Sequence, residues 1–545
     1  MPAEPRAGHE TIDVHVRPAA ALARHARLLD ALSRWFPVRF VPEPADAGAE
    51  SAPAIVFAAD ATAAEEARDA LHTGLVFVES ASRGTRAEVR LGGDARVDPR
   101  LRGRRLEDHR ARGAAVPARP GEAVLAEGPD GPLWVAAAAE AHRVDLAAAP
   151  EPLAPDAGVR DAFRDGRFLA VLALIDALRR WTAASAWESP PLRAALVVDD
   201  PNLHWPSYGY LDFADADRAA AEHGYHLAIA MVPLDGWFAH PRAADTFRRS
   251  ERLSLLFHGH THVREELARP RTLGAAVHDL ERAVARVRAF ERRAGLDVSP
   301  VMAPPHGSCA PVTLDALRRT EIAAMCMNRP HPWRDRPPAS RPLACTAPGD
   351  WVRGFPVIGR HKLAASPADL ALTAYLDRPL VVYGHHGDLR HGLRVLAEAA
   401  REINDLGPVR WESLGAIARS NLLSRREGRR LRVRPYSRDV EVDVPDGVDE
   451  LVVELPDGLT GQTDVQIHAG GEAAGGAAER RSLEDCVPVA PGPTRIALRE
   501  REHRSALNGT RPPAELWPVA RRLAVEVRDR FAPALARRPR VGGRR

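Results

Sequence analysis

Three histidines occupy alternate positions in the segment "LSLLFHGHTHVREEL", residues 253–267: His258, His260 and His262. They follow directly on an apolar run that ends at Phe257. A strand interior favours aliphatic and aromatic residues, and a cluster of imidazoles adds nothing to packing. Neutral imidazole is a common ligand for zinc and similar ions. Two interpretations therefore stand at this point, a histidine-rich polar loop and a metal site.

A pair of aspartates, Asp199 and Asp200, ends another apolar run in "LVVDDPN". Adjacent carboxylates repel each other and are tolerated best with a cation nearby. Taken alone, "DDPN" is more typical of a turn or a helix cap. His258 and His262, four residues apart, can reach one ion if the chain turns helical after Phe257. One aspartate and two histidines would leave an open coordination position for water, as a catalytic metal requires.

Two more segments carry candidate residues. "MAPPHGSC", residues 302–309, is a rigid loop that can present backbone N–H groups and a close ligand wall. "VVYGHHGDL", residues 381–389, ends an apolar run on His385 and His386, and a histidine at such a strand end is a candidate general acid. Aromatic side chains that could stack on a sugar ring follow the aspartates in "LHWPSYGY". The candidate substrate-binding residues are Pro305, His306, Gly307, Trp205 and Tyr208.

The sequence predicts that parallel strands position these residues. Six apolar runs between residues 194 and 388 are continuous rather than alternating, which is typical of strands covered on both faces. Helical patterns lie between most of them, the clearest at 272–295. Several runs end in charged or imidazole side chains, and active sites of parallel α/β folds form at those carboxyl ends. The runs lie at residues 194–200, 226–233, 253–260, 298–307, 321–330 and 380–388.

At 545 residues the chain is too long for one core, and we expect four parts. Residues 1–190 alternate strands and helices, which predicts an α/β layered domain with a mostly parallel sheet. This region weakly resembles flavodoxin-like or class I amidotransferase-like domains, but it has no cysteine to act as the amidotransferase nucleophile. Residues 191–428 hold the parallel series, 429–502 alternate like a small β-sandwich, and 503–545 contain a helix and a basic tail.

Composition narrows the classes of function. The 76 basic and 73 acidic residues leave a formal charge of +3, which argues against a nucleic-acid binder. Four cysteines without a CxxC pair do not make a disulfide framework and favour a cytoplasmic protein. The most apolar stretch, from Phe168, is short and carries Asp176, so we expect no integral membrane segment. Protein partners are not indicated.

The order of these motifs resembles the polysaccharide deacetylase family of carbohydrate esterases, over roughly residues 194–420. The resemblance implies an α/β fold whose central part is an irregular (β/α) barrel of about seven strands. It also implies a divalent metal, zinc with cobalt or nickel as alternatives, and removal of acetyl groups from an N-acetylated carbohydrate. The implied roles are base for Asp199, metal ligand for Asp200, His258 and His262, and acid for His385, with His386 as the competitor.

The chain departs from the family pattern at several positions. Val197 and Val198 replace a threonine and an aromatic residue before the aspartates, and Gly259 replaces a serine or threonine. Ala303 stands where the family has the arginine that holds the base. On this resemblance, either Arg329 or Arg360 would have to take over that role.

Two other functions remain open from the sequence. "HGHTH" resembles the GHxH element of metallophosphoesterases, although the GNH element of that family is missing. A catalytically inactive barrel that binds carbohydrate is the third alternative, and the missing arginine favours it. Burial of two aspartates and two histidines speaks against it, because such groups are costly to bury without a use.

Overall fold

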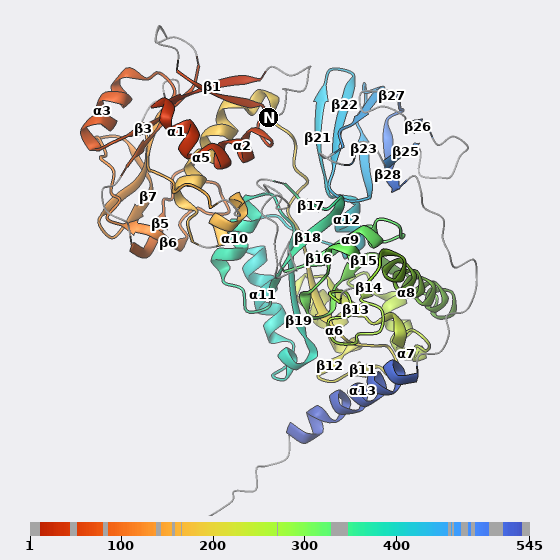
Figure 1. Ribbon diagram of the computed structural model, residues 1–545. Helices are drawn as coiled ribbons and strands as arrows, with labels where there is room; N and C mark the ends of the chain where they lie inside the picture. Colours follow the sequence, from red (N-terminus) through yellow and green to blue (C-terminus); the bar gives the residue numbers. More distant parts are fainter. Residues whose placement is uncertain are drawn as a thin grey trace, which may run out of the picture. The chain divides into compact units, whose positions relative to one another are not determined.

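The computed structural model describes most of the chain and groups it into two compact units (Figure 1). The first consists mainly of residues up to 188 together with 366–376, and the second of the remaining described residues from 189 onward. The described residues are 11–43, 52–79, 85–137, 143–154, 158–164, 166–269, 271–328, 347–455, 459, 463–469, 478–480, 486–500 and 516–536.

The first unit is built on a nine-stranded mixed sheet in the order β2-β1-β3-β4-β9-β8-β7-β5-β6. The strands from β2 to β9 pair in parallel, and those from β9 to β6 pair antiparallel. The sheet is therefore half parallel rather than mostly parallel. Its strands are β1 (Ile12–Arg17), β2 (Val38–Pro42), β3 (Ala54–Ala58), β4 (Gly74–Val78), β5 (Thr85–Leu91), β6 (Arg105–Arg112), β7 (Ala123–Gly128), β8 (Gly131–Ala136) and β9 (Val144–Ala148). Its helices are α1 (Ala19–Arg24), α2 (Ala26–Ser33), α3 (Ala61–Ala70), α4 (Val159–Arg164), α5 (Leu169–Trp181) and α10 (Pro367–Tyr375).

The second unit contains a closed parallel barrel, which confirms the predicted fold class. Seven strands follow one another in the order β13-β14-β15-β16-β18-β19-β10, and β10 pairs with β13 to close the ring. Every pair around the ring is parallel. The strands are β10 (Arg193–Asp199), β13 (Leu227–Met231), β14 (Leu253–His258), β15 (Val298–Ala303), β16 (Ala324–Met327), β18 (Phe355–Lys362) and β19 (Leu380–His385).

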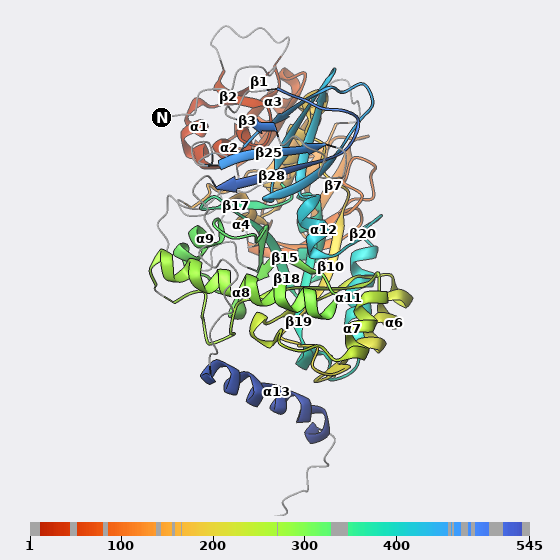
Figure 2. The same ribbon diagram turned by 90° about the vertical axis from the view of Figure 1, so that its right-hand side faces the viewer.

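Short strands and helices complete the barrel, and α6, α7 and α8 are seen along its outside in Figure 2. The two-stranded pair β11 (Ser207–Tyr208) and β12 (Leu211–Asp212) follows β10, β17 (Asp350–Val352) pairs with β18, and β20 (Arg410–Trp411) pairs with β10. The helices are α6 (Phe213–His223), α7 (Pro241–Arg249), α8 (Leu273–Ala294), α9 (Pro311–Leu317), α11 (Arg394–Asn404) and α12 (Leu414–Arg419).

The strand missing from the sequence-based prediction is β18. Its residues "FPVIGRHK" carry a proline, a glycine and three basic or imidazole side chains, so they do not form the apolar run by which the other six were found.

The barrel interior is filled by small and branched side chains that alternate along the strands. One buried cluster contains Ala195, Val197, Ala228, Ala230, Leu256, Val301, Ala303, Ala324, Cys326, Ile358, Val381 and Tyr383. Because side chains alternate between the two faces of a strand, the next inward positions toward the carboxyl ends can be counted. They are Asp199 on β10, His258 on β14, Arg360 on β18 and His385 on β19. The interior thus changes from apolar to charged at one end of the barrel.

Two four-stranded sheets follow the barrel and share one hydrophobic core, as a sandwich does. The first of these strands begins at Leu422, earlier than the boundary expected at 429. The strands are β21 (Leu422–Glu427), β22 (Arg430–Pro435), β23 (Asp439–Val444), β24 (Glu450–Val453), β25 (Thr463–Ala469), β26 (Ala478–Arg480), β27 (Val487–Pro488) and β28 (Gly492–Glu500). A last helix, α13 (Leu516–Ala536), follows, and the arginine-rich end of the chain lies outside the described residues. Among the described helices, none has the length and apolar character needed to cross a bilayer.

Candidate metal centre

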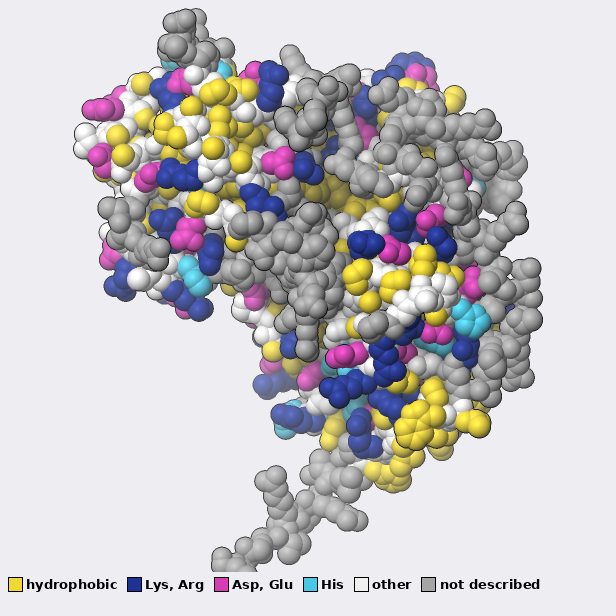
Figure 3. All heavy atoms as spheres, viewed as in Figure 1, with side chains coloured by type: hydrophobic (Ala, Val, Ile, Leu, Met, Phe, Trp, Pro, Cys, Tyr) yellow, Lys and Arg dark blue, Asp and Glu magenta, His cyan; other side chains and the backbone are white. Residues whose placement is uncertain are grey.

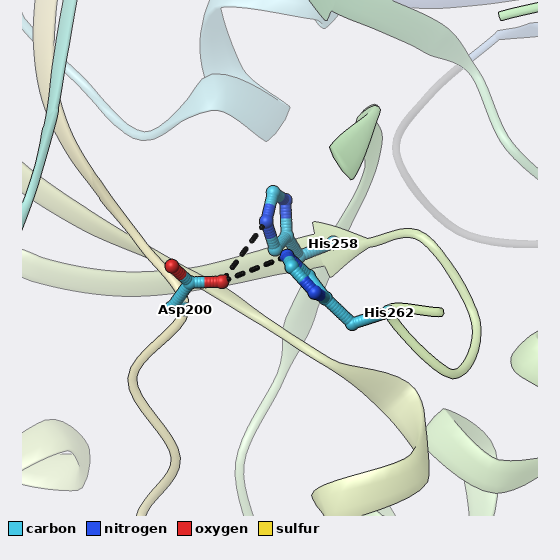
Figure 4. Close-up of side chains that lie close together, drawn as sticks. All are labelled: Asp200, His258 and His262. Carbon is cyan, nitrogen blue, oxygen red and sulfur yellow. Dashed lines mark ion pairs between the residues drawn. The ribbon is translucent and has the colours of Figure 1, made fainter. Parts of the chain in front are cut away.

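Asp200, His258 and His262 come together at the carboxyl end of the barrel (Figure 4). One ligand atom from each lies within 4.8 Å of the other two. Asp200 Oδ1 is 2.9 Å from His262 Nε2 and 3.4 Å from His258 Nε2. In the part of the chain that the structure describes, this is the one group of three such side chains with that spacing.

His258 is oriented by a hydrogen bond on the far side of its ring. It ends β14 and is 2% exposed, and its Nδ1 lies 3.0 Å from the carbonyl oxygen of Ala303 on β15. A carbonyl can only accept, so Nδ1 carries the proton and Nε2 presents a lone pair to the cluster. Such a backbone partner on the second ring nitrogen is the usual support of a metal-binding histidine.

The chain between the two histidines is a loop and not the helical turn that the spacing suggested. Gly259 has φ +68° and His262 has φ +56°, both in the left-handed region. The loop is held by the buried carboxylate of Glu266, which accepts from the amides of His260 and Thr261 at 2.7 and 2.8 Å. It also accepts from the Thr261 hydroxyl at 2.6 Å. Hydrogen bonds to Glu266 therefore hold the segment between His258 and His262, in place of the expected helical hydrogen bonds.

Asp200 leaves β10 in an unusual backbone conformation, φ +89°. Successive strand residues point to opposite faces, so two adjacent aspartates would normally diverge. The left-handed conformation at Asp200 accounts for both carboxylates serving the same end of the barrel. Three of the positive-φ residues other than glycine are Asp200, His262 and His306, and all lie at this site. Such strain is typical of functional sites, where the surrounding structure maintains it.

The electrostatics suit a cation. Burial opposes ionisation of the Asp200 carboxyl, but interactions with His258 and His262 outweigh burial and hold the pKa of Asp200 well below its ordinary value. Its buried Oδ1 lies against the Nε2 atoms of both imidazoles. One oxygen and two imidazole nitrogens match the ligand preferences of zinc and neighbouring transition metals.

His260 lies away from this cluster. It is 4% exposed, and its Nε2 contacts the guanidinium of Arg286 on α8. Burial, together with the nearby arginines, lowers the pKa of His260 well below its ordinary value. The middle histidine of "HGHTH" is thus a neutral structural residue behind the loop.

Asp199, the candidate base, is buried beside the cluster and pairs with Arg360. Both residues are nearly inaccessible, and Asp199 Oδ1 accepts from Arg360 Nη1 at 3.0 Å. The guanidinium also lies 3.8 Å from the ring centroid of Tyr383 on β19. Of the two arginines named from the sequence, Arg360 is thus one that pairs with the candidate base. Arg329, the other candidate, lies outside the described residues.

The two candidate acids at the end of β19 have different surroundings. His385 is the register partner of Asp199 on the neighbouring strand, falls on the inward position and is exposed at the barrel mouth. The ring of His386 packs against Tyr208 and Tyr210, with its Nε2 3.4 Å from Asp529 of α13. The alternation of β19 favours His385 as the group that faces the site.

The remaining candidates from the sequence differ in how far their side chains are exposed. His306 is exposed and its ring lies 5.1 Å from that of His262, while Gly307 and Ser308 donate their amides within the Pro305–Gly307 turn. Trp205 is 53% exposed with the Arg530 guanidinium 4.6 Å from its ring. Tyr208, in contrast, is 1% exposed and donates its hydroxyl to Asp529 at 2.9 Å, so it offers no open ring face for stacking.

Helix α13 contacts the loops that carry the metal ligands, which the sequence did not indicate. Arg522 Nη2 donates to the carbonyl oxygen of Asp200 at 3.2 Å, and Arg521 Nη1 donates to that of His262 at 2.5 Å. Arg522 also pairs through Nε with Asp235, at the end of the turn after β13, at 3.0 Å. The helix therefore holds the carbonyls of Asp200 and His262, the two candidate metal ligands in left-handed conformations.

Two acidic residues of α13 complete the contact. Glu526 Oε2 lies 2.8 Å from His204 Nδ1 and accepts from Asn202 Nδ2 at 3.1 Å, while Asp529 contacts Tyr208 and His386. Residues 522, 526 and 529 follow helical spacing, which was the available signal. Charges at such spacing usually form a solvated face, so the sequence did not distinguish this arrangement from an ordinary surface.

Comparison with known proteins gives fold-level similarity alone. No family model and no curated protein matches the chain. Among solved structures, a family 4 carbohydrate esterase from Streptomyces lividans matches with 12% identity and a TM-score of 0.24, covering 40% of this chain and 89% of that one. A family 4 pseudoenzyme from Bacillus anthracis matches with 10% identity and a TM-score of 0.27, covering 42% and 66%. A peptidoglycan deacetylase from Bacillus subtilis matches with 11% identity and a TM-score of 0.25, covering 43% and 93%.

Identities and TM-scores at this level do not assign the chain to a family. The esterase, the deacetylase and the pseudoenzyme also differ in activity, so they do not decide whether this barrel is active. Function is therefore inferred from the geometry of the site.

Proposed function

We propose that the barrel is a metal-dependent hydrolase that removes acetyl groups from an N-acetylated carbohydrate. The observation that carries the proposal is the convergence of Asp200, His258 and His262 beside a second buried carboxylate, Asp199, which is itself held by Arg360. Three protein ligands leave room for water and substrate on one ion, as catalytic metal sites require. A two-metal phosphoesterase would need ligands for two ions, and the described residues contain one such group.

The residues of the chain divide the reaction between them. A divalent cation held by Asp200, His258 and His262 would polarise the acetyl carbonyl and make water more acidic. Asp199 takes a proton from the attacking water as the new C–O bond forms. Arg360 keeps the Asp199 carboxylate oriented through its hydrogen bond to Oδ1. His385 gives a proton to the amide nitrogen as the C–N bond breaks, so that acetate and a free sugar amine leave.

Metal analysis of the purified chain tests the first half of the proposal. One equivalent of zinc, cobalt or nickel is expected in the unaltered protein and none in His258→Ala. His278→Ala on α8 is the matched control, because it removes a histidine outside the cluster and should leave the metal content unchanged. Equal metal content in all three proteins would show that the cluster is a polar loop.

Acetate release from N-acetylated oligosaccharides tests the second half. Asp199→Asn is expected to lower turnover by at least about a hundredfold with the metal retained, since it removes the base and spares the ligands. His385→Ala should lower turnover more for an amide than for an activated ester, because only the amine needs a proton to depart. A protein that binds metal but releases no acetate from any substrate would be the inactive, carbohydrate-binding alternative.

A further inference from the structure

Helix α13 has its polar and apolar faces reversed relative to an ordinary surface helix. Its buried positions are charged, because Arg522, Glu526 and Asp529 are 3%, 7% and 4% exposed. Its solvent-facing positions are apolar except for Arg528. A helix on a soluble protein normally buries its apolar stripe and exposes its charges.

The outer stripe of α13 is strongly exposed. Exposed fractions are 82% for Leu516, 72% for Trp517, 45% for Leu523, 54% for Val527 and 58% for Phe531. The other exposed large hydrophobic side chains within the described residues are Trp205, Trp237 and Phe238. We call these eight residues the apolar face.

The three loop residues adjoin α13. Arg530 of α13 lies over the Trp205 ring, and the Trp237 ring is 4.5 Å from His204, which contacts Glu526. Phe238 in turn lies 5.9 Å from Trp237, between ring centroids. Figure 3 shows hydrophobic side chains gathered at this end of the second unit, beside a group of arginines. All the large exposed hydrophobics of the described chain thus belong to one neighbourhood.

Within the described residues, the apolar face cannot be buried by turning α13 while the present contacts hold. Turning the helix over would move Arg522, Glu526 and Asp529 into solvent and leave their partners Asp235 and His204 opposite apolar side chains. Burying charged groups without partners is costly. Apolar surface collected in one place on a protein marks a binding site for an external partner.

We propose that the apolar face docks on the surface of an anionic phospholipid bilayer. Three of its eight residues are tryptophans, whose amphipathic rings favour the level of the lipid headgroups. Arg528, whose side chain is 72% exposed and pairs with Asp529, stands next to Val527 in the helix. Residues 537–545, which follow α13, contain five arginines and no acidic residue. Apolar side chains with flanking basic residues are the chemistry of interfacial helices.

The positive charge near the apolar face favours an anionic bilayer over a second copy of the chain as the partner. In a two-fold dimer through the apolar face, the same surface of each copy would meet, so the Arg528 side chains of both copies would lie at one interface. A bilayer with negative headgroups would attract these same groups. Docking on lipid is independent of acetate release, so it can be tested whether or not the barrel is a deacetylase.

The experiment measures co-sedimentation of the full chain with lipid vesicles. We expect binding to vesicles of phosphatidylcholine with phosphatidylglycerol, at least about tenfold weaker binding to phosphatidylcholine alone, and weakening at high salt. Leu523→Ser/Phe531→Ser should lower binding by at least about tenfold, whereas the conservative Leu523→Met/Phe531→Leu should retain it. Both pairs change exposed side chains, and an unaltered thermal midpoint verifies folding.

Two arginine variants test the electrostatic part of the proposal. Arg528→Gln should weaken binding several-fold, and Arg429→Gln, which removes an equally exposed arginine from the turn between β21 and β22, should not. Equal binding by the serine and conservative variants would overturn the proposal. The absence of vesicle binding would also overturn the proposal. If the unaltered chain is then a dimer and the serine variant is a monomer, the apolar face is the contact between two copies.

Discussion

Gly259 illustrates how a single residue departs from a family pattern for a local reason. The family has serine or threonine there, but a Cβ at this position would collide with Glu266 Oε1 and with the ring of Pro305. Its φ of +68° also disfavours any other residue. The carboxylate of Glu266 thus occupies the space that a side chain at 259 would need, and it holds the turn through the amides of His260 and Thr261.

Gly259→Ser is expected to weaken zinc binding by about 10- to 100-fold, because displacement of Glu266 would release the loop that presents His262. Titration calorimetry with zinc would measure the loss. Gly274→Ser is the matched control, since a Cβ there meets nothing within 4 Å. Equal affinities for the two variants would show that the loop does not depend on Glu266.

The Asp199–Arg360 pair is a second case in which a residue outside the motif supports a candidate site residue, here from another strand of the barrel. The sequence could name Arg360 as a substitute for the missing arginine, but it could not choose it. The contact joins β10 to β18, and β18 itself escaped the apolar pattern. Residues near each other in the chain, such as His258 and His262, could be assigned to one ion from spacing. The contact of Arg360 with Asp199 could not be chosen in this way, because it joins distant strands and nothing local encodes it.

Arg360→Met should destabilise the second unit by about 3 to 5 kcal/mol, because it leaves a buried carboxylate without its cation. The double variant Asp199→Asn/Arg360→Met should lose much less than the sum of the two single changes. Denaturant unfolding of all four proteins gives this cycle. Additive losses would mean that the pair contributes no coupling to stability.

At the scale of elements, continuous apolar runs identified six of the seven barrel strands and the end at which the site lies. The runs failed at β18, and they did not reveal that the sheet of the first unit changes direction after β9. Strand direction depends on which strands become neighbours, and the sequence shows only local pattern. Helix α13 was predicted as a helix, but its place over the barrel mouth was not, because its charged positions looked like a solvated face.

Removal of α13 is expected to weaken the metal site. A chain ending at Glu500 loses the donors that Arg521 and Arg522 provide to the carbonyls of His262 and Asp200. We expect zinc affinity to fall by about 10- to 100-fold, as when other supports of metal ligands are removed. A chain ending at Ala536 keeps the helix and serves as the control. An unchanged zinc affinity in the shorter chain would show that α13 covers the site without supporting zinc binding.

At the scale of the whole molecule, the two units should respond to acid separately. In the first unit His25 is 2% exposed and its ring stacks on Phe57 with centroids 4.5 Å apart. Burial, with a smaller contribution from Arg24, lowers the pKa of His25 from 6.5 to about 4. The unfolded chain therefore binds a proton at His25 more readily than the folded chain between these two pKa values.

The free energy of unfolding of the first unit should be fully retained above pH 6.5 and fall by up to roughly 3 kcal/mol as the pH drops toward 4. His25→Phe keeps the stacking and removes the titrating group, so its stability should vary less with pH over this range. His72→Phe, at an exposed position, should keep the slope. Thermal unfolding followed at several pH values measures this. The same slope in His25→Phe would assign the acid response to other groups.

The closure of the barrel through β10 has a consequence for biogenesis. The three metal ligands have all been synthesised once the chain reaches His262, but β10 also pairs with β19, which ends at His385. Asp199 and Asp200 therefore lie on a strand that lacks one of its neighbours until more than a hundred further residues have left the ribosome. Sheets joined over such sequence distances form slowly. The emerging chain would carry its ligands unassembled, so metal would be acquired only after the barrel has been completed.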